Sequence, residues 1–236
     1  QGVCSGLHTI SINNNNNKKL FKYIRIMTMT KSPLQIARAA YQPKMPVALQ
    51  GNVSLKEGAK TQSVADQEEI QKLFPNTYGM PVIEFEPAAQ AAEVAPFNVG
   101  VILSGGQAPG GHNVISGIFD GLKSLNKDSK LYGFLGGPSG LVDHKYMELT
   151  AEIVDEYRNT GGFDIIGSGR TKLEETAQFD KGIEICNELG IKALIIIGGD
   201  DSNTNACVLA EYYLQKNTGI QAIGCPKTID GDLKNN

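Results

Sequence analysis

The chain has 236 residues, which allows one or two domains, and no apolar run approaches the roughly 18 residues that a membrane span requires. Its 22 Lys and Arg and 25 Asp and Glu give a formal charge of −3, but residues 1–56 hold eight of the basic residues and none of the acidic ones. The other 14 basic and 25 acidic residues give residues 57–236 a formal charge of −11, which argues against nucleic acid as a partner, and the lack of a long apolar run argues against a membrane.

The basic N-terminal stretch is predicted to be a disordered extension over residues 1–60. It contains a homopolymer of asparagine, Asn13 to Asn17, and too little apolar surface to offset the entropy cost of ordering. An organellar transit peptide is the alternative, although residues 1–60 have only two arginines and do not begin with methionine. Met27 and Met29 are candidate start residues.

Residues 61–96 are predicted to form a helical and irregular connector. The S-x-x-D sequence from Ser63 precedes Ile70 and Leu73, which indicates a capping box on a short helix. Prolines then interrupt the chain at positions 75, 81, 87 and 96. We expect this segment to pack over the surface of a domain or to bridge to a partner subunit.

A compact domain is expected over residues 97–236, and it opens with a strand, a glycine-rich loop and a helix. Residues 98–103 are apolar, and Gly105 and Gly106 lie in the loop that follows. The helix is predicted from apolar residues at helical spacing, namely Val114, Ile115, Ile118, Leu122 and Leu125. The loop is neither G-x-G-x-x-G nor a Walker loop, because His112 stands where a Walker loop needs Lys. Gly105 and Gly106 are candidates for a phosphate loop, with a plain tight turn as the alternative.

Two further pairs of strand and loop follow. Residues 131–135 lead into the glycine loop 136–140, to which we assign no chemistry. Residues 163–167 are predicted to lead, as a strand, into a loop with two cations, Arg170 and Lys172. Such cations either belong to a solvated loop or bind an anion. Residues 141–158 fit a strand and a helix equally well.

The last helices complete an alternating pattern. A helix over residues 177–189 is predicted to bury Phe179, Ile183 and Cys186 and to end at Gly190. Another is predicted from Ala206, Leu209, Ala210 and Tyr213. The alternation of strands and helices predicts an α/β fold: an open, mostly parallel sheet with helices on both faces, a Rossmann-like three-layer sandwich that is incomplete at the C-terminus.

The four cysteines lack C-x-x-C spacing, which indicates reduced thiols in a cytoplasmic protein rather than a zinc site.

The strand-to-helix corner at residues 195–206 is the strongest candidate for a binding site. A short apolar run ends at two glycines, and a helix is predicted to begin at Ser202. Gly199 lets a ligand approach the backbone, and the free N–H groups at the start of the helix favour a phosphate. Because adjacent carboxylates repel phosphate, Asp200 is predicted to hold Mg²⁺, which bridges carboxylate and phosphate oxygens. Alternatively, Asp201 or Ser202 is an N-cap and the glycines form an ordinary turn.

A second corner, at residues 224–233, follows a predicted strand over residues 220–224. It again brings polar side chains to the end of a strand: Lys227, Thr228, Asp230 and Asp232. Adjacent strand ends in a parallel sheet share one crevice, which is where such folds bind ligands. We therefore expect both corners to contribute to one site.

Four motifs, in this order, resemble the 6-phosphofructokinase superfamily: SGGQAPGGHNV at 104–114, GSGRTK at 167–172, GGDDSNTNA at 198–206 and PKTIDGDL at 226–233. The resemblance runs from Val99 to Lys234. Within the superfamily, the chain more specifically resembles the catalytic, β-type subunits of the pyrophosphate-dependent branch. It implies reversible, Mg²⁺-dependent phosphoryl transfer from diphosphate to fructose 6-phosphate, a cytoplasmic step of glycolysis and gluconeogenesis. It also implies an allosteric enzyme that forms homo-oligomers, or hetero-oligomers with a regulatory subunit. By this resemblance the chain is an N-terminal portion with part of its sugar-phosphate site beyond Asn236, and we expect the isolated chain to be inactive.

Phosphoryl transfer needs a metal, cations on the transferring group and a base for the accepting hydroxyl. The resemblance puts Arg170 near the transferring phosphoryl group, and the ammonium of Lys227 is a second candidate cation. Asp230 is the predicted general base for the 1-hydroxyl of the sugar, and Asp232 is either an assisting carboxylate or a turn residue. Diphosphate is assigned to Gly105, Gly106, Gly199 and Ser202, and the sugar substrate to Thr228, Ile229 and Asp230.

The resemblance also suggests how the phosphoryl donor is chosen. Asp201 and Lys227 together mark the pyrophosphate-using branch, whereas ATP-using members carry glycine at the position of Asp201. The alternatives are an ATP-dependent 6-phosphofructokinase, against which Asp201 argues, and a non-catalytic regulatory subunit, which would not need Asp230 as a base.

Overall fold

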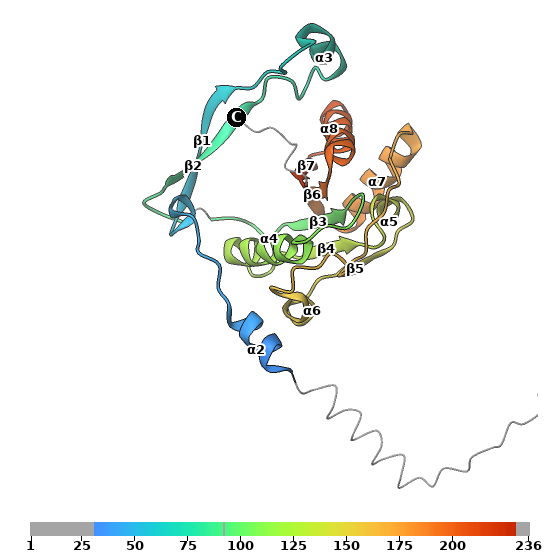
Figure 1. Ribbon diagram of the computed structural model, residues 1–236. Coiled ribbons are helices and arrows are strands. Elements are labelled where there is room, and N and C mark those ends of the chain that lie inside the picture. Colours follow the sequence, from blue (N-terminus) through green and yellow to red (C-terminus); the bar gives the residue numbers. More distant parts are fainter. Residues whose placement is uncertain (1–30, 92, 230–236) are drawn as a thin grey trace, which may run out of the picture. The chain divides into compact units, whose positions relative to one another are not determined.

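The computed structural model describes residues 31–91 and 93–229 and divides the chain into two units, Gln1–Tyr41 and Gln42–Asn236 (Figure 1). In the first unit, helix α2 (Pro33–Ala40) begins with a capping box. The Ser32 hydroxyl accepts from the Gln35 N–H, and the Gln35 side chain accepts from the Ser32 N–H, so two backbone donors at the helix start are satisfied.

The second unit opens with a two-stranded antiparallel sheet that the sequence analysis did not predict. A short 3₁₀ helix (Val47–Leu49) precedes β1 (Val53–Lys60), and helix α3 (Gln67–Leu73) separates it from β2 (Pro81–Pro87). Leu55 lies opposite Phe85. The predicted disordered extension to residue 60 was therefore too long, because β1 gains its backbone hydrogen bonds from a strand far along the chain, which composition does not reveal. The predicted capping box at Ser63 was wrong as well: α3 begins after Asp66, whose φ of 51° is left-handed and whose side chain caps nothing.

The main sheet has five strands in the order β5-β4-β3-β6-β7. Strands β3 (Asn98–Leu103), β4 (Leu131–Phe134), β6 (Ile191–Gly198) and β7 (Gln221–Pro226) run parallel, and β5 (Tyr146–Glu148) is an antiparallel edge. The helices between them are α4 (Gly111–Leu125), α5 (Pro138–Val142), α6 (Ala151–Tyr157), α7 (Thr176–Glu188) and α8 (Asp200–Gln215). The mostly parallel sheet predicted from the alternation is confirmed.

Helices cover both faces of this sheet, which gives the unit two apolar cores (Figure 1). Side chains alternate between the faces along a strand, and β3 shows the consequence. Val101 and Leu103 pack in the core that contains Ile115 of α4, whereas Ile102 packs in the core that contains Leu209 of α8. The three-layer arrangement is therefore confirmed.

Some local predictions were wrong. Residues 163–167 form no strand; their apolar side chains are buried because this loop packs into the α4 core. Two residues further on, Gly169 makes an isolated parallel bridge with Ser104. Leu125, the last residue of α4, is 52% exposed, although its spacing puts it on the apolar face of the helix. Helix α8 begins at Asp200, two residues before the predicted start at Ser202. The ambiguous stretch 141–158 contains β5 and α6.

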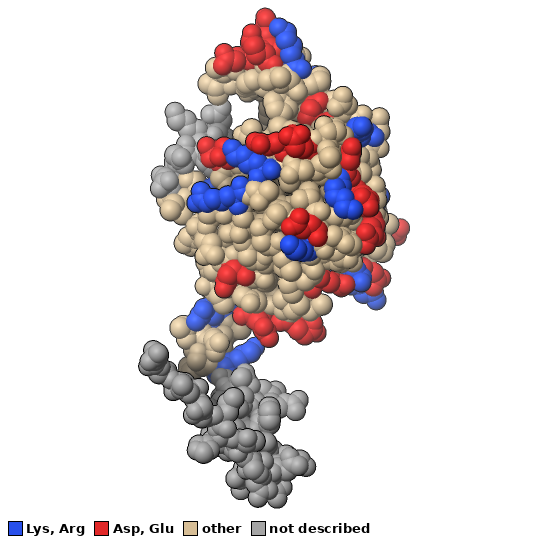
Figure 2. Space-filling view, turned by 90° about the vertical axis from the view of Figure 1, so that its right-hand side faces the viewer, with Lys and Arg blue, Asp and Glu red and all other residues tan. Residues whose placement is uncertain are grey.

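The described surface carries both signs of charge. On the face shown in Figure 2, Lys and Arg side chains are interspersed with Asp and Glu side chains. Among the described helices, none combines the length and the apolar character needed to cross a membrane.

Candidate active site

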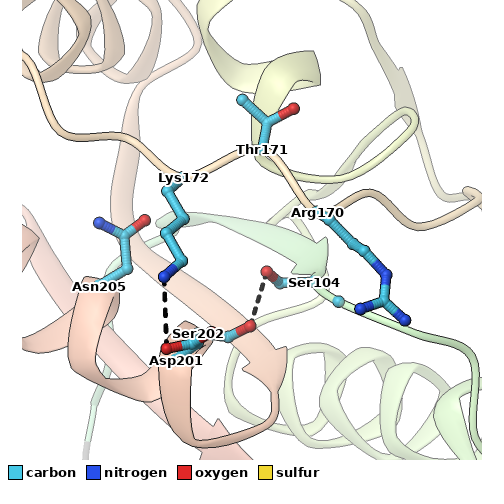
Figure 3. A pocket seen from close by; sticks show the side chains of 8 residues that line it. Ser104, Arg170, Thr171, Lys172, Asp201, Ser202 and Asn205 are labelled. Atoms are coloured by element: carbon cyan, nitrogen blue, oxygen red, sulfur yellow. Dashed lines mark hydrogen bonds and ion pairs between the residues drawn. The ribbon is translucent and has the colours of Figure 1, made fainter.

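A pocket of about 270 Å³ lies at the carboxyl ends of β3 and β6, which are neighbours in the sheet (Figure 3). Three segments form it: the residues that follow β3, the loop before α7 and the first turns of α8. Its lining consists of Ser104, Gly105, Arg170, Thr171, Lys172, Asp201, Ser202 and Asn205. The structure thus brings together four of the predicted site residues: Gly105, Arg170, Asp201 and Ser202.

The predicted phosphate loop shapes one wall of the pocket. The Ser104 N–H donates to the carbonyl of Ile197 at 2.8 Å, and the Gly105 N–H donates to the carbonyl of Gly169 at 2.8 Å. Gly105 has a φ of +84°, which a residue with a side chain rarely adopts. At Gly106, a β-carbon would lie 3.1 Å from an Nη atom of Arg170. Glycine at position 106 therefore leaves room for the guanidinium of Arg170.

The third glycine loop, to which no chemistry was assigned, holds the Arg170 loop in place. A β-carbon on Gly137 would collide with the backbone of Gly169. The Gly136 N–H also donates to the carbonyl of Ile166 at 2.9 Å. These glycines allow the two loops to pack backbone against backbone, and this fixes the base of Arg170.

The start of α8 forms the opposite wall. Gly199 is the N-cap residue, and no side chain caps the helix. The alternative interpretation, that Asp201 or Ser202 is a side-chain cap, is therefore wrong. The Asn203 side chain instead donates to the carbonyls of Gly198 and Gly199, both at 2.7 Å.

Ser202 contributes differently from what was expected of a diphosphate ligand. Its side chain is only 8% exposed, and its hydroxyl donates to the hydroxyl of Ser104 at 2.8 Å. What Ser202 offers to a ligand is its backbone at the positive end of the helix dipole. Gly199 has room above it, since a β-carbon there would meet only the carbonyl oxygen of Lys227, at 3.9 Å.

The charged side chains of the pocket divide into a pair and a single cation. The Nζ atom of Lys172 lies 3.3 Å from Oδ1 of Asp201, and the two side chains are 50% and 74% exposed. Arg170 makes no ion pair or hydrogen bond with the residues that the structure describes. The pairing of Lys172 with Asp201 was not predicted, because it joins positions 29 residues apart.

Asp200, the predicted metal ligand, is exposed beside this pocket and does not line it. Within residues 31–91 and 93–229, no three His, Cys, Asp or Glu side chains are grouped as a metal site. A metal held by Asp200 would therefore need most of its ligands from elsewhere.

The second predicted corner adjoins the first, as expected. Strand β7 pairs with β6, and the Lys227 N–H donates to the carbonyl of Gly198 at 2.8 Å. The Lys227 ammonium lies 5.7 Å from the centre of the Phe163 ring. Ile229 is 74% exposed. Thr228 is exposed too. Asp230 and Asp232, the predicted base and its assistant, lie outside the described residues.

His112, in the first motif, is a structural residue. It is 3% exposed, and its Nε2 atom accepts from the N–H groups of Asp164 (2.9 Å) and Ile165 (3.0 Å). Its Nδ1 atom lies 2.6 Å from the hydroxyl oxygen of Thr160. Burial lowers the pKa of His112, although the Asp164 carboxylate opposes this shift. The imidazole orders the segment that leads to Arg170.

Comparisons with known proteins agree with the motifs. Residues 98–236 match the family model described as Phosphofructokinase. The chain is 67% identical over 207 residues to pyrophosphate–fructose 6-phosphate 1-phosphotransferase of Porphyromonas gingivalis, covering 88% of this chain and 38% of that protein. It is 50% identical over 204 residues to the β subunit 1 of the Arabidopsis thaliana protein of that name, covering 86% and 36%. The chain therefore spans little more than a third of the length of these relatives.

A solved structure shares the fold. Pyrophosphate-dependent phosphofructokinase from Nitrosospira multiformis superposes with a TM-score of 0.54 at 22% identity, covering 59% of this chain and 35% of that chain.

Proposed function

The chain belongs to the phosphofructokinase family, and on that premise we propose that it is part of an enzyme that transfers a phosphoryl group reversibly from diphosphate to the 1-hydroxyl of fructose 6-phosphate. The products are fructose 1,6-bisphosphate and phosphate. The observation that carries this proposal is the pocket at the ends of β3 and β6, where Arg170, Lys172 and Asp201 line one small cavity.

The pocket suits a short, highly charged anion. The uncapped start of α8 directs backbone N–H groups and the positive end of its dipole toward this wall. Arg170 has no partner among the described residues, and its planar guanidinium can donate two parallel hydrogen bonds to phosphate oxygens. We assign the diphosphate to this pocket, with Gly105, Gly106, Gly199 and Ser202 as backbone neighbours.

The donor set at Asp200 fits a Mg²⁺ ion that arrives with the diphosphate. Mg²⁺ in phosphoryl-transfer sites is held by one or two carboxylates, substrate phosphates and water rather than by a protein cage. Asp200 is exposed and, among the described residues, belongs to no group of three possible ligands, so the ion would take its other ligands from phosphate and water. The ion would neutralise phosphate charge and orient the donor.

The remaining roles follow the motifs. Arg170 and Lys227 stabilise the charge on the phosphoryl group in transfer. Thr228 and Ile229 contact the sugar substrate, and Asp230 takes the proton of its 1-hydroxyl, a role worth about 10²- to 10⁴-fold in rate. Asp232 orients or assists Asp230. For the two aspartates the support is the sequence motif alone.

ATP is the competing donor, and Asp201 opposes it. An ATP chain would continue past the β-phosphate toward this carboxylate, where like charges would repel and the side chain would obstruct the path. The β-type relative from Arabidopsis thaliana supports assembly with further subunits. The three described cysteines, Cys186, Cys207 and Cys225, are free thiols, which supports a reducing, cytoplasmic location.

The test is turnover by the complete protein that carries this chain. Diphosphate and fructose 6-phosphate should yield fructose 1,6-bisphosphate, and phosphate should drive the reverse reaction. Asp230→Ser should lower kcat by about 10²-fold or more with little change in KM, because a base acts in the transition state. Turnover with ATP and none with diphosphate would refute the proposal.

A further inference from the structure

Lys172 and Asp201 form an ion pair at the wall of the donor pocket. The Nζ to Oδ1 distance is 3.3 Å, and Figure 3 shows the lysine side chain reaching from its loop to the first turn of α8. Arg170, from the same loop, extends toward another wall of the pocket. Among the described residues, this loop therefore supplies one cation that pairs with a carboxylate, Lys172, and one that does not, Arg170.

The backbone beside Lys172 is anchored to α8, so the pairing is built into the fold. The N–H of Leu173 donates to the side-chain oxygen of Asn205 at 3.2 Å, and the Asn205 amide donates back to the carbonyl of Leu173 at 2.6 Å. Leu173 itself is buried in the core. These contacts fix the position of Lys172 relative to the helix turn that carries Asp201.

The pair contributes little to folding, because both side chains are half exposed or more and surface ion pairs are weak. Its effect is on the pocket. Without a partner, the Asp201 carboxylate would repel an anion at the same wall where the α8 dipole attracts one. The Lys172 ammonium offsets part of that repulsion.

On the basis of the proposed function, we propose that Lys172 is a positioning residue that acts through Asp201. It holds this carboxylate and offsets part of its charge, so that an acidic residue can stand at the wall of a diphosphate site with little repulsion of diphosphate. A longer donor would still meet the Asp201 side chain. The binding of diphosphate itself is left to Arg170 and the start of α8.

A double-mutant cycle tests this role in the complete protein, with the dissociation constant of Mg²⁺–diphosphate measured by titration calorimetry. Lys172→Met should weaken binding about tenfold, because it leaves a carboxylate unpaired at the wall. Asp201→Asn should change binding by less than about threefold, and Lys172→Met with Asp201→Asn should bind within about threefold of the wild type. Lys172→Arg should bind like the wild type.

Lys181→Met is the matched control. It removes a lysine that pairs with Glu184 on α7 at 2.9 Å, away from the lining of the pocket, and should leave binding unchanged. If the double variant binds as weakly as Lys172→Met, Lys172 contacts diphosphate directly and the proposal is wrong. If Lys172→Met binds normally, it is wrong as well. Failure of the wild type to bind diphosphate would instead overturn the proposed function.

Discussion

The hydroxyl oxygens of Ser104 and Ser202 lie 2.8 Å apart, with Ser202 as the donor, although 98 positions separate them in the chain. Both side chains are buried, at 5% and 8% exposure. Ser104 follows β3 and Ser202 lies in the first turn of α8, so this bond ties the two walls of the pocket together.

Ser202→Ala should therefore destabilise the fold. It removes a buried hydrogen bond and leaves the Ser104 hydroxyl without its partner, which costs about 1 kcal/mol in the free energy of unfolding. Urea unfolding of both proteins measures the difference. Ser124→Ala, which removes an exposed hydroxyl bonded to the carbonyl of Gly121, is the control and should change stability far less. Equal effects of the two substitutions would show that the buried Ser202–Ser104 hydrogen bond contributes no more to stability than the exposed one.

Gly106→Ala should weaken diphosphate binding about tenfold by displacing the guanidinium of Arg170, since a misplaced phosphate contact loses a charge-assisted hydrogen bond. The new β-carbon would lie 3.1 Å from Arg170, and stability should barely change because the crowded atoms end a flexible side chain. Gly121→Ala is the control: nothing lies within 4 Å of a β-carbon at that position in α4. Titration calorimetry gives the comparison, and unchanged affinity in Gly106→Ala would place Arg170 outside the diphosphate site.

His112 should make the fold less stable in acid. Its pKa is below the ordinary 6.5 in the folded state because of burial, so the unfolded chain binds this proton first as the pH falls. The stability that the neutral imidazole contributes is complete above pH 6.5 and is lost as the pH falls through the lower, folded-state pKa.

Urea midpoints between pH 7.5 and pH 5 measure this loss. His112→Asn should flatten the dependence. If the pH dependence of the urea midpoint persists in His112→Asn, groups other than His112 cause it and the prediction is wrong.

Glu211 should hold the turn that follows α3 against α8. Its carboxylate accepts from the N–H of Asn76 at 3.1 Å and from the N–H and hydroxyl of Thr77, both at 3.0 Å. Glu211→Ala should speed amide exchange at Asn76 and Thr77 about tenfold, since bonds to a charged acceptor are the stronger ones. The exchange rates in Glu211→Gln, which keeps one acceptor oxygen, should lie between those of the wild type and those of Glu211→Ala. Unaltered exchange in Glu211→Ala would mean that the turn is held by other contacts.

The main sheet was predictable because its strands are apolar runs closed by glycines. Residues 98–103 are β3 as predicted. Because β3 and β6 are parallel neighbours, the sequence could also predict that Gly105 and Asp201 lie close together. Strand β1 was not predictable, since most of its side chains are exposed and its partner strand lies beyond a helix.

The side-chain contacts within the site could not be predicted from the sequence. The contacts of Lys172 with Asp201 and of Asn205 with Leu173 join a loop to a helix more than 25 positions away, and no local pattern marks them. Residues 163–166 were predicted to form a strand because they are mostly apolar. They form a loop instead, and its apolar side chains are buried in the core that contains α4.

The central claim, that Asp201 makes this a diphosphate rather than an ATP site, is tested most directly by kcat/KM for both donors in the complete protein. Asp201→Gly should raise the efficiency with ATP relative to diphosphate by about 10²-fold or more, because it removes charge and volume from the path of a longer donor. Asp201→Asn, which removes charge alone, should give part of that change. Unmeasurable ATP use and unchanged diphosphate use in both variants would contradict the account.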